Sequence, residues 1–243
     1  MEFKKILTLF AVFLAVSGVA LALPGANIES STPQERWSGD PAADQNDTTE
    51  GGNVTFLELN GTSLTDRWAG YYGNISSVVL YLTDETGGSS NHLYQWTGAG
   101  GPADWTSGIV CAAQDSAFDW SNAAAATGIE VNTAWSFGSV ADNATQTFTL
   151  TGCDIDFTAT GDQDVTGAAM IDNSGPAGSS TFSTCGIHDD NSATEPDFAF
   201  CTPNVTDTGS GVNYKGDAVN FELIVPITAT ETDTYFFFLE VEY

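Results

Sequence analysis

Basic residues are nearly absent from this chain. Only five of its 243 residues are Lys or Arg, against 32 Asp and Glu, and the formal net charge at pH 7 is −27. Lys4 and Lys5 stand at the extreme N-terminus, so Arg36, Arg67 and Lys215 serve the whole remainder. Such a surface repels phosphate backbones and anionic headgroups. The composition therefore excludes nucleic-acid binding and disfavours electrostatic docking on an anionic membrane.

The acidity has two interpretations. Self-repulsion should destabilise the compact state at low salt, and salt at high concentration shortens the range of that repulsion to a few ångströms. Adaptation to a salty medium is the interpretation we favour. A surface that collects cations is the alternative.

Histidine and the common catalytic motifs are also scarce. The chain has two histidines, His92 and His188, and no Cys-x-x-Cys pair, which disfavours a zinc or haem site. Neither Gly-x-Ser-x-Gly nor His-Glu-x-x-His occurs, so no motif supports hydrolase chemistry. The run His188-Asp189-Asp190 is best interpreted as an exposed turn. Glycoside cleavage by a pair of carboxylates remains an open alternative, because so acidic a chain contains close acid pairs in any fold.

Calcium is the one metal for which the sequence offers candidate ligands. Asp154 and Asp156 flank Ile155, and on a strand their carboxylates would point the same way; Asp162 and Asp164 follow shortly after. The alternation with Ile155 and Phe157 equally indicates the solvated face of a strand. No other cofactor is expected.

Long hydrophobic runs are confined to the N-terminus. Two lysines, an apolar stretch at residues 6–16 and the ending Ala20-Leu21-Ala22 have the pattern of a secretory signal, residues 1–22, cleaved before Leu23. The alternative is an uncleaved anchor over residues 6–23, which is short for a bilayer and interrupted by Ser17 and Gly18. We expect no membrane span after cleavage and an extracellular or cell-surface location.

Export changes how the cysteines are interpreted. An even number of cysteines in an exported chain predicts two disulfides. Three connectivities are possible, and we expect the sequential one, in which the first cysteine pairs with the second and the third with the fourth. The four residues are Cys111, Cys153, Cys185 and Cys201.

Export also gives meaning to the Asn-x-Ser/Thr triplets, which are acceptor sites for N-linked glycans. Asn and Thr are common in turns in any case, so some triplets need not be modified. The six acceptors are Asn46, Asn53, Asn60, Asn74, Asn143 and Asn204.

Residue patterns divide the chain into three parts: the signal, a flexible polar lead-in at residues 23–52, and a folded domain at residues 53–243. Strands are predicted at residues 54–59, 67–73, 77–83, 92–96, 147–150, 154–158 and 221–225. A further strand is predicted at the C-terminus. There Tyr235, Phe237, Leu239 and Val241 share a face that stays buried, while the opposite face of the strand becomes acidic. A helical turn is predicted at residues 123–126 and a strand at residues 129–137. These expectations add up to an all-β fold, a single β-sandwich or jelly-roll-like domain of about eight to ten strands.

Aromatic residues form a further candidate site. Trp68, Tyr71 and Tyr72 stand close together, and a β face lined by such rings could stack on sugars. Core packing explains the same residues more simply.

Two segments resemble uncharacterised secreted surface proteins of archaea. One is Arg67-Trp-Ala-Gly-Tyr-Tyr-Gly-Asn-Ile-Ser, which is followed by a short β run; the other is Gly216-Asp-Ala-Val-Asn-Phe-Glu-Leu-Ile-Val-Pro, followed by Thr234-Tyr-Phe-Phe-Phe-Leu-Glu. The likeness covers about half of the expected domain. It implies an archaeal surface or extracellular origin and brings no established catalytic residues.

Together these features predict an exported, glycosylated structural protein of the cell surface, without enzymatic activity, that serves as a subunit of a surface filament or layer. Its expected partners are copies of itself or other surface proteins, with glycans as further ligands. A polar, proline-rich lead-in is a poor donor for strand exchange. The alternatives are a secreted carbohydrate-binding module and a secreted hydrolase.

Overall fold

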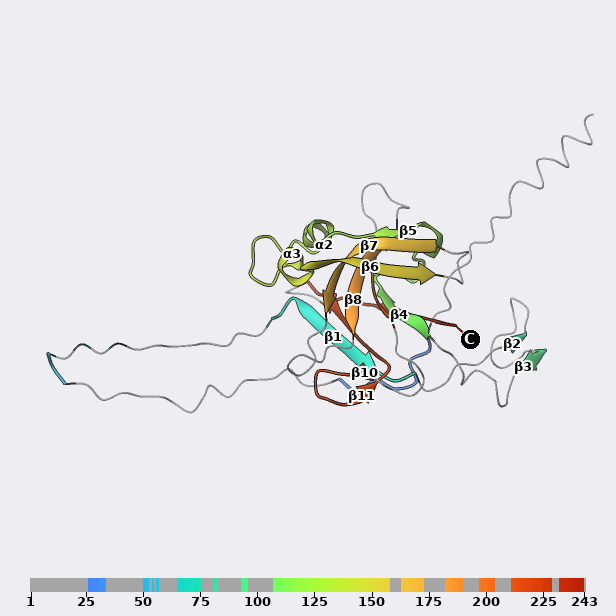
Figure 1. Ribbon diagram of the computed structural model, residues 1–243, viewed down its shortest axis with the longest axis horizontal. Coiled ribbons are helices and arrows are strands. Elements are labelled where there is room, and N and C mark those ends of the chain that lie inside the picture. The colour runs from blue at the N-terminus through green and yellow to red at the C-terminus, as the bar shows by residue number, and fades with distance from the viewer. Residues whose placement is uncertain are drawn as a thin grey trace, which may run out of the picture.

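The computed structural model describes residues 26–33, 50–52, 54, 56, 65–75, 81–82, 93–95, 107–157, 163–172, 182–189, 197–203, 211–228 and 232–242. Strands dominate this part of the chain and its helices are short, which confirms the predicted all-β, sandwich-like domain (Figure 1). The elements are β1 (Trp68–Gly73), β2 (Tyr81–Leu82), β3 (Tyr94–Gln95), β4 (Ser107–Ala113), the 3₁₀ turn η2 (Trp120–Asn122), β5 (Ala123–Ala125), α2 (Gly128–Ala134), α3 (Ala144–Thr147), β6 (Leu150–Phe157), β7 (Gln163–Asp172), β8 (Ser183–Asp189), β9 (Phe198–Pro203), β10 (Gly211–Val212), β11 (Ala218–Val219), β12 (Phe221–Pro226) and β13 (Phe236–Glu242).

Several expectations fall outside these residues. The predicted signal and most of the strand at residues 54–59 are among them. The described parts of the lead-in, residues 26–33 and 50–52, contain no helix or strand. Within the described residues, no helix has the length and apolar character needed to cross a membrane.

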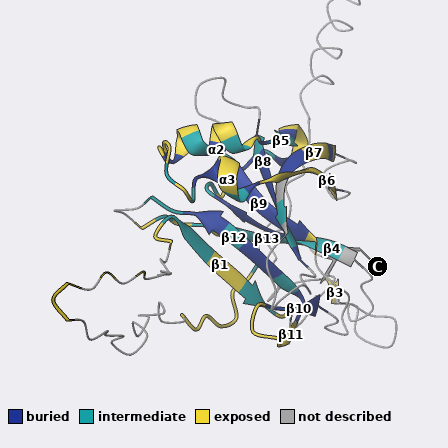
Figure 2. Cartoon of the chain, turned by 60° about the vertical axis from the view of Figure 1, so that its left-hand side comes forward, coloured by how far each residue is buried: buried dark blue, intermediate teal, exposed yellow. Residues whose placement is uncertain are grey.

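One seven-stranded sheet organises the fold. Its order is β13-β4-β9-β8-β7-β6, with β5 also pairing with β8, and the pairs are antiparallel. A separate ribbon, β1 paired with β12, lies across β8 and β9 (Figure 2). Ribbon and sheet are joined by a hydrogen bond of 3.1 Å from the Ile224 N–H to Thr184 Oγ1.

The central strands are buried on both faces, because apolar residues occupy both parities. In β4, Val110 and Ala112 face the ribbon and the helices α2 and α3, whereas Cys111 and Ala113 face the opposite core. The same division holds in β9. The sequence of a strand that is buried on both faces is a continuous apolar run, without the alternation of apolar and polar residues.

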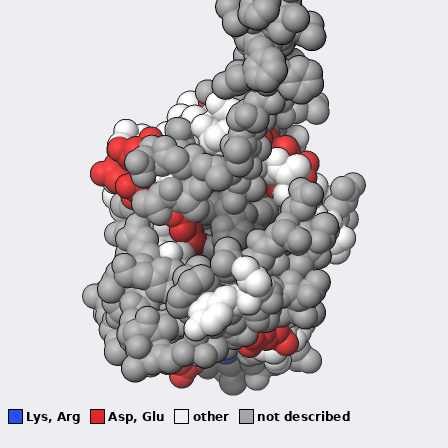
Figure 3. All heavy atoms as spheres, turned by 90° about the vertical axis from the view of Figure 1, so that its right-hand side faces the viewer, with Lys and Arg blue, Asp and Glu red and all other residues white. Residues whose placement is uncertain are grey.

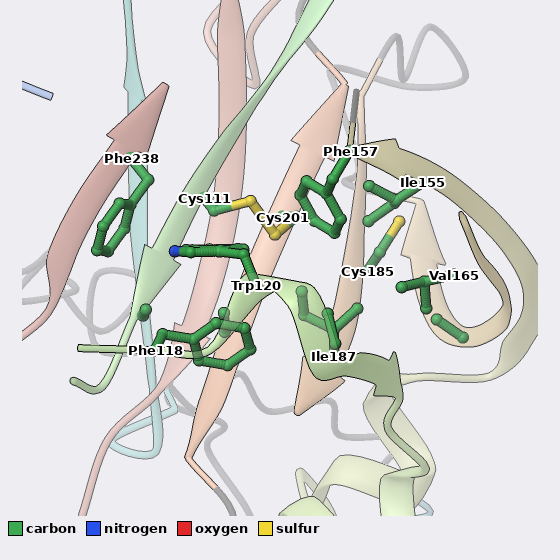
Figure 4. Close-up of a cluster of buried hydrophobic side chains, with 14 of the residues drawn as sticks. Cys111, Phe118, Trp120, Ile155, Phe157, Val165, Cys185, Ile187, Cys201 and Phe238 are labelled. Atoms are coloured by element: carbon green, nitrogen blue, oxygen red, sulfur yellow. A yellow bond between two sulfur atoms is a disulfide. The ribbon is translucent and has the colours of Figure 1, made fainter. Parts of the chain in front are cut away.

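Trp120 fills the core on the side away from the ribbon. Its ring is buried between Phe238 on one side and Phe157 on the other, beside the disulfide of Cys111 and Cys201 (Figure 4). The η2 turn positions this ring, because Asp119 caps the turn by accepting a hydrogen bond from the Ser121 N–H. A single-turn element thus covers the centre of the sheet.

The four cysteines form two nested disulfides, so the sequential pairing is wrong. Cys111 and Cys201 face each other directly on β4 and β9, with their Cα atoms 4.1 Å apart. Cys153 on β6 is bonded to Cys185 on β8, although β7 separates these strands. Proximity in sequence favoured short loops, but the strand order decides which cysteines meet.

The inner disulfide, between Cys153 and Cys185, shows that the sheet curls. On a flat sheet, strands two places apart are separated by about 9.5 Å, beyond the Cα separation of about 6.8 Å that a disulfide tolerates. The Cα atoms of Cys153 and Cys185 are only 6.0 Å apart. The pairing of β6 with β7 shifts register on both sides of Cys153, and Gly152 and Gly167 have positive φ there. Such bulges bend a strand pair, which folds β6 over the core.

Two predictions of secondary structure for residues 123–137 are wrong. Residues 123–125 are strand β5 instead of a helical turn, because small side chains fit where the chain pairs with β8 beside β7. The predicted strand at residues 129–137 contains helix α2, and Ile129 is 70% exposed while Val131 is fully buried. Thr127 and Glu130 form a capping box that starts this helix, and its sequence signal was missed.

The C-terminal prediction is confirmed in its strands but not in its burial. β12 and β13 form where alternation placed them, and Pro226 ends β12. The face expected to become acidic and solvated is instead buried at Glu240, which is 5% exposed, whereas Phe236 is 40% exposed. Glu240 stands on the same side of β13 as Phe238, which packs into the Trp120 core.

Candidate functional site

The calcium candidates lie on the curled edge of the sheet. Asp154 and Asp156 are exposed on β6, and Asp164, also exposed, is paired with Asp156 from β7. Asp162 lies outside the described residues. In the described part of the chain, no three His, Cys, Asp or Glu side chains come together as metal ligands. The arrangement matches the solvated face of a strand.

The glycan acceptors divide by burial. Asn74 is exposed just after β1. Asn143 is 7% exposed, and its side chain caps α3 by accepting a hydrogen bond from the Gln146 N–H while its amide donates to Val140 O. A glycan on this amide nitrogen is incompatible with the fold, so Asn143 is a structural residue. The other four acceptors, Asn46, Asn53, Asn60 and Asn204, lie outside the described residues.

Trp68, the first of the three candidate aromatic residues, is part of the core. Its ring packs edge-on against Phe137 and Phe148, each with centroids 5.6 Å away. Its indole N–H donates to Asp142 O at 2.7 Å. The ring is partly buried against the core and ties the ribbon to the loop between α2 and α3.

The two tyrosines point to opposite sides of the ribbon. Tyr71 packs edge-on against Phe237 of β13, and burial raises the pKa of its phenol. Tyr72 meets Tyr214 at an interplanar angle of 76°, and Lys215 Nζ lies 5.6 Å and 5.4 Å from the two ring centroids. Rings set at this angle, with a cation over both, form a cation–π cluster and not a flat platform for sugars. The predicted carbohydrate platform does not assemble from these residues.

Asp189 has a structural role that the sequence did not reveal. It is 4% exposed at the end of β8, and its two carboxylate oxygens accept hydrogen bonds from the N–H groups of Asp119 and Asp197. The interpretation of this run as an exposed turn is therefore wrong at Asp189. Burial, then the charges of Asp189 and Asp115, raise the pKa of Asp197.

The outer edge of β13 presents backbone groups that point away from the sheet. The short Cα separation of Cys111 and Cys201 marks a non-hydrogen-bonded pair, so the backbone of Cys111 bonds toward β13. Its partner there is Phe238. By alternation, the N–H and C=O groups of Phe237, Leu239 and Val241 point outward, away from the sheet.

One residue of the lead-in lies on this edge. The Ala26 N–H donates to Phe237 O at 2.8 Å, which confirms the outward direction of that carbonyl. Ala26 is half-buried, whereas residues 27–33 are all exposed. The rest of the outward row, at Leu239 and Val241, has no hydrogen-bond partner among the described residues.

The two edges of the sheet differ in kind. The β6 edge carries exposed aspartates and two register shifts, which are devices that prevent a sheet from pairing with another chain. The β13 edge is a seven-residue strand in unbroken register with β4, and it has no Lys, Pro or bulge. Its sequence is rich in the aromatic and β-branched residues that favour pairing. The β13 edge is the more regular of the two, although its buried Glu240 is an inward-pointing charge, one of the features that discourage pairing.

No family model, no curated protein and no solved structure matches this chain. The two segments on which the expected resemblance rests lie together in space: β1 and β12, one from each, pair over their whole lengths.

Proposed function

We propose that this chain is an exported structural protein of the cell surface, of archaeal type, which works by associating through its sheet edge. The observation that carries the proposal is the β13 edge, where the outward backbone groups of Leu239 and Val241 have no hydrogen-bond partner among the described residues. The predicted signal and the glycan acceptors support export. The two disulfides agree with an oxidising compartment outside the cytosol.

The charge supports an external role in a salty medium. In the face shown in Figure 3, acidic side chains stand at several separate places and basic atoms are barely visible among the described residues. Copies carrying a formal charge of −27 repel one another until salt screens them. Association is therefore expected where ionic strength is high.

Neither alternative gains support from the site. The carbohydrate platform required Trp68, Tyr71 and Tyr72 on one face, and they are divided among the core and two sides of the ribbon. For a hydrolase, Asp189 offers no free acid, because both of its carboxylate oxygens accept hydrogen bonds from backbone N–H groups.

The test is to locate the chain in an expressing host. Antibody labelling in electron microscopy should place it in a filament or layer outside the cell, and a Leu14→Arg variant, which breaks the predicted signal, should stay inside. Peptide mass spectrometry of the exported chain should find a glycan on Asn74 and none on Asn143. A chain found in the cytosol, or free in the medium as a monomer at the host's salt concentration, would contradict the proposal.

A further inference from the structure

Two tyrosines and a lysine meet beside the end of β1, where the β10–β11 hairpin comes close to the ribbon (Figure 1, Figure 2). The ring centroids of Tyr72, on β1, and Tyr214, in the hairpin turn, are 5.7 Å apart. Lys215 Nζ lies over both rings and donates a hydrogen bond of 3.4 Å to Tyr72 Oη. Tyr214 is 47% exposed, and Lys215 is exposed as well. The cluster therefore presents aromatic surface and an ammonium group to the solvent.

The turn that carries Tyr214 and Lys215 is held in place by a buried asparagine. Asn213 is fully buried, and its side-chain oxygen accepts hydrogen bonds of 2.9 Å from the N–H groups of Lys215 and Asp217. Its own N–H donates to Asp217 O at 2.9 Å. The Tyr214 N–H is fixed as well, since it donates to the carboxylate of Glu222. Groups that are already ordered lose little conformational entropy when a ligand docks on them.

The glycan acceptor Asn74 lies two residues beyond Tyr72 and is exposed. Cα atoms so close in sequence are at most about 7 Å apart. Buried Asn220 fixes the backbone on both sides of the acceptor: its N–H donates to Gly73 O at 2.9 Å, and its side-chain oxygen accepts from the Ile75 N–H at 3.0 Å. A sugar linked to the Asn74 side chain therefore begins beside the cluster.

We propose that the cluster of Tyr72, Tyr214 and Lys215 is a seat for the first sugar of a glycan attached to Asn74. This rests on the proposed function, because export brings Asn74 to the glycosylating enzymes. The negative face of an aromatic ring attracts the C–H groups on one face of a sugar ring, and Tyr214 has ring surface exposed for this contact. The Lys215 ammonium can donate to the oxygens of the sugar. A corner of two rings holds a single tethered sugar, whereas a flat platform binds a free polysaccharide.

A seated sugar joins two parts of the fold. It is linked covalently to the end of the ribbon at Asn74 and packs on the turn of the β10–β11 hairpin at Tyr214. Packing of this kind does not depend on net charge, so it persists at salt concentrations that screen surface ion pairs. The seated glycan should therefore stabilise the domain, whereas a glycan that extends into solvent should leave its stability nearly unchanged.

The experiment compares thermal unfolding of the exported, purified chain with that of Ser76→Ala, which removes the acceptor triplet and keeps Asn74. Mass spectrometry establishes that the first carries the glycan on Asn74 and that the second does not. The glycan should raise the unfolding midpoint by about 2–4 °C, as expected for one aromatic contact in a domain of this size.

The same comparison is then made in two tyrosine variants. In Tyr214→Leu, the gain that the glycan brings should fall below half of its wild-type value. Tyr71→Leu is the matched control, because that ring lies on the other side of the ribbon against Phe237, and the gain should be retained. Each gain is a difference between two forms of one variant, so the effect of the tyrosine substitution on the fold itself cancels.

Ring-current shifts locate the sugar without relying on stability. In nuclear magnetic resonance spectra of the glycosylated chain, protons of the first sugar should be shifted upfield, and these shifts should vanish in Tyr214→Leu and remain in Tyr71→Leu. An unmodified Asn74, a glycan whose removal leaves the midpoint unchanged, or a gain that survives the loss of Tyr214 would each overturn the proposal. These measurements use purified protein, so none of them bears on the cell-surface location, which microscopy tests separately.

Discussion

Asp189 shows how one side chain joins three segments of the chain. Its carboxylate accepts from the backbone of Asp119, which caps η2, and from Asp197, which precedes β9, while the residue itself ends β8. The Asp189 N–H also donates to Asp197 O at 3.0 Å. Through Asp119, the same contacts hold the turn that positions Trp120 over the sheet. The buried carboxylate is thus part of the core architecture.

Replacement of Asp189 should be costly. Asp189→Ala leaves two buried N–H groups without their charged acceptor, and we expect a loss of about 2–3 kcal/mol in the free energy of unfolding. Asp154→Ala on the exposed face of β6 is the control, expected to change stability by less than about 0.5 kcal/mol. Urea unfolding with the disulfides intact measures both. Equal effects of the two substitutions would contradict the assigned role of Asp189.

Glu222 couples stability to pH. It is 8% exposed on β12 and accepts a hydrogen bond from the Tyr214 N–H at 2.9 Å. Burial raises the pKa of this carboxyl above its ordinary value of 4.5, and the bond from Tyr214 offsets only part of that effect. The folded state therefore binds a proton more tightly than the unfolded state does. Below pH 4.5 this proton favours folding, and the contribution is lost as pH rises through the higher folded pKa.

Glu222→Gln should remove this dependence while its amide oxygen still accepts from Tyr214. The variant should match the wild type at low pH and exceed it in stability above the folded pKa of Glu222, with the gap opening as pH rises. Urea midpoints measured across this range test the expectation, with Asp154→Asn as an exposed control. A gap that is largest in acid would show that the sign is wrong.

At the scale of elements, helix α2 depends on its first residues. The Thr127 hydroxyl accepts from the Glu130 N–H, and the Glu130 carboxylate accepts from the Thr127 N–H at 2.7 Å. Burial alone would raise the pKa of the Glu130 carboxyl, but the hydrogen bonds that it accepts from the Thr127 hydroxyl and the Thr127 N–H, with the charge of His188, hold that pKa below its ordinary value. We expect Thr127→Ala to cost about 1 kcal/mol, and Ile129→Ala, at an exposed position, to cost less than about 0.5 kcal/mol. Thermal unfolding compares the two, and a silent T127A would contradict the importance of the cap.

Local pattern predicted some elements well and others wrongly, for physical reasons. β1, β12 and β13 follow the expected runs closely, although burial does not alternate strictly along β1 or β12. Val131 and Trp135 share odd parity with Ile129, which suggested a strand, but their spacing of four residues fits a helix equally, and the cap decides between the two. β5 could not be predicted, because three alanines carry no pattern and become a strand only by pairing with β8.

The site was less predictable than the fold. The apolar character of β13 is visible in the sequence, but its position at an edge depends on the order of the whole sheet. The contact of Ala26 with Phe237 joins residues from opposite ends of the chain, and no local pattern announces it. The aromatic candidates were misleading for a simpler reason: Tyr71 and Tyr72 are neighbours on one strand and point to opposite sides of it, and Trp68 packs against the core.

At the scale of the whole molecule, the two nested disulfides join different pairs of strands. The outer bond spans 90 residues and fastens β4 to β9 in the middle of the sheet, and the inner bond spans 32 residues and holds the curled β6 against β8. In the chain-entropy model, loops of these lengths contribute about 4.6 and about 3.7 kcal/mol. These contributions are large beside the stability of about 5–15 kcal/mol typical of a folded domain.

Removal of either disulfide should therefore destabilise the domain, but in different strands. Replacing Cys153 and Cys185 by Ala should cost about 4 kcal/mol and speed hydrogen exchange first in β6, since that strand would lose its tie across the curl. Replacing Cys111 and Cys201 should lower stability by a similar amount with its largest exchange effect in β4 and β9, at the centre. Non-reducing peptide mapping of the wild type provides the reference and should recover Cys111 joined to Cys201. Recovery of Cys111 joined to Cys153 would contradict the structure, in which β9, β8 and β7 lie between β4 and β6 in the sheet order.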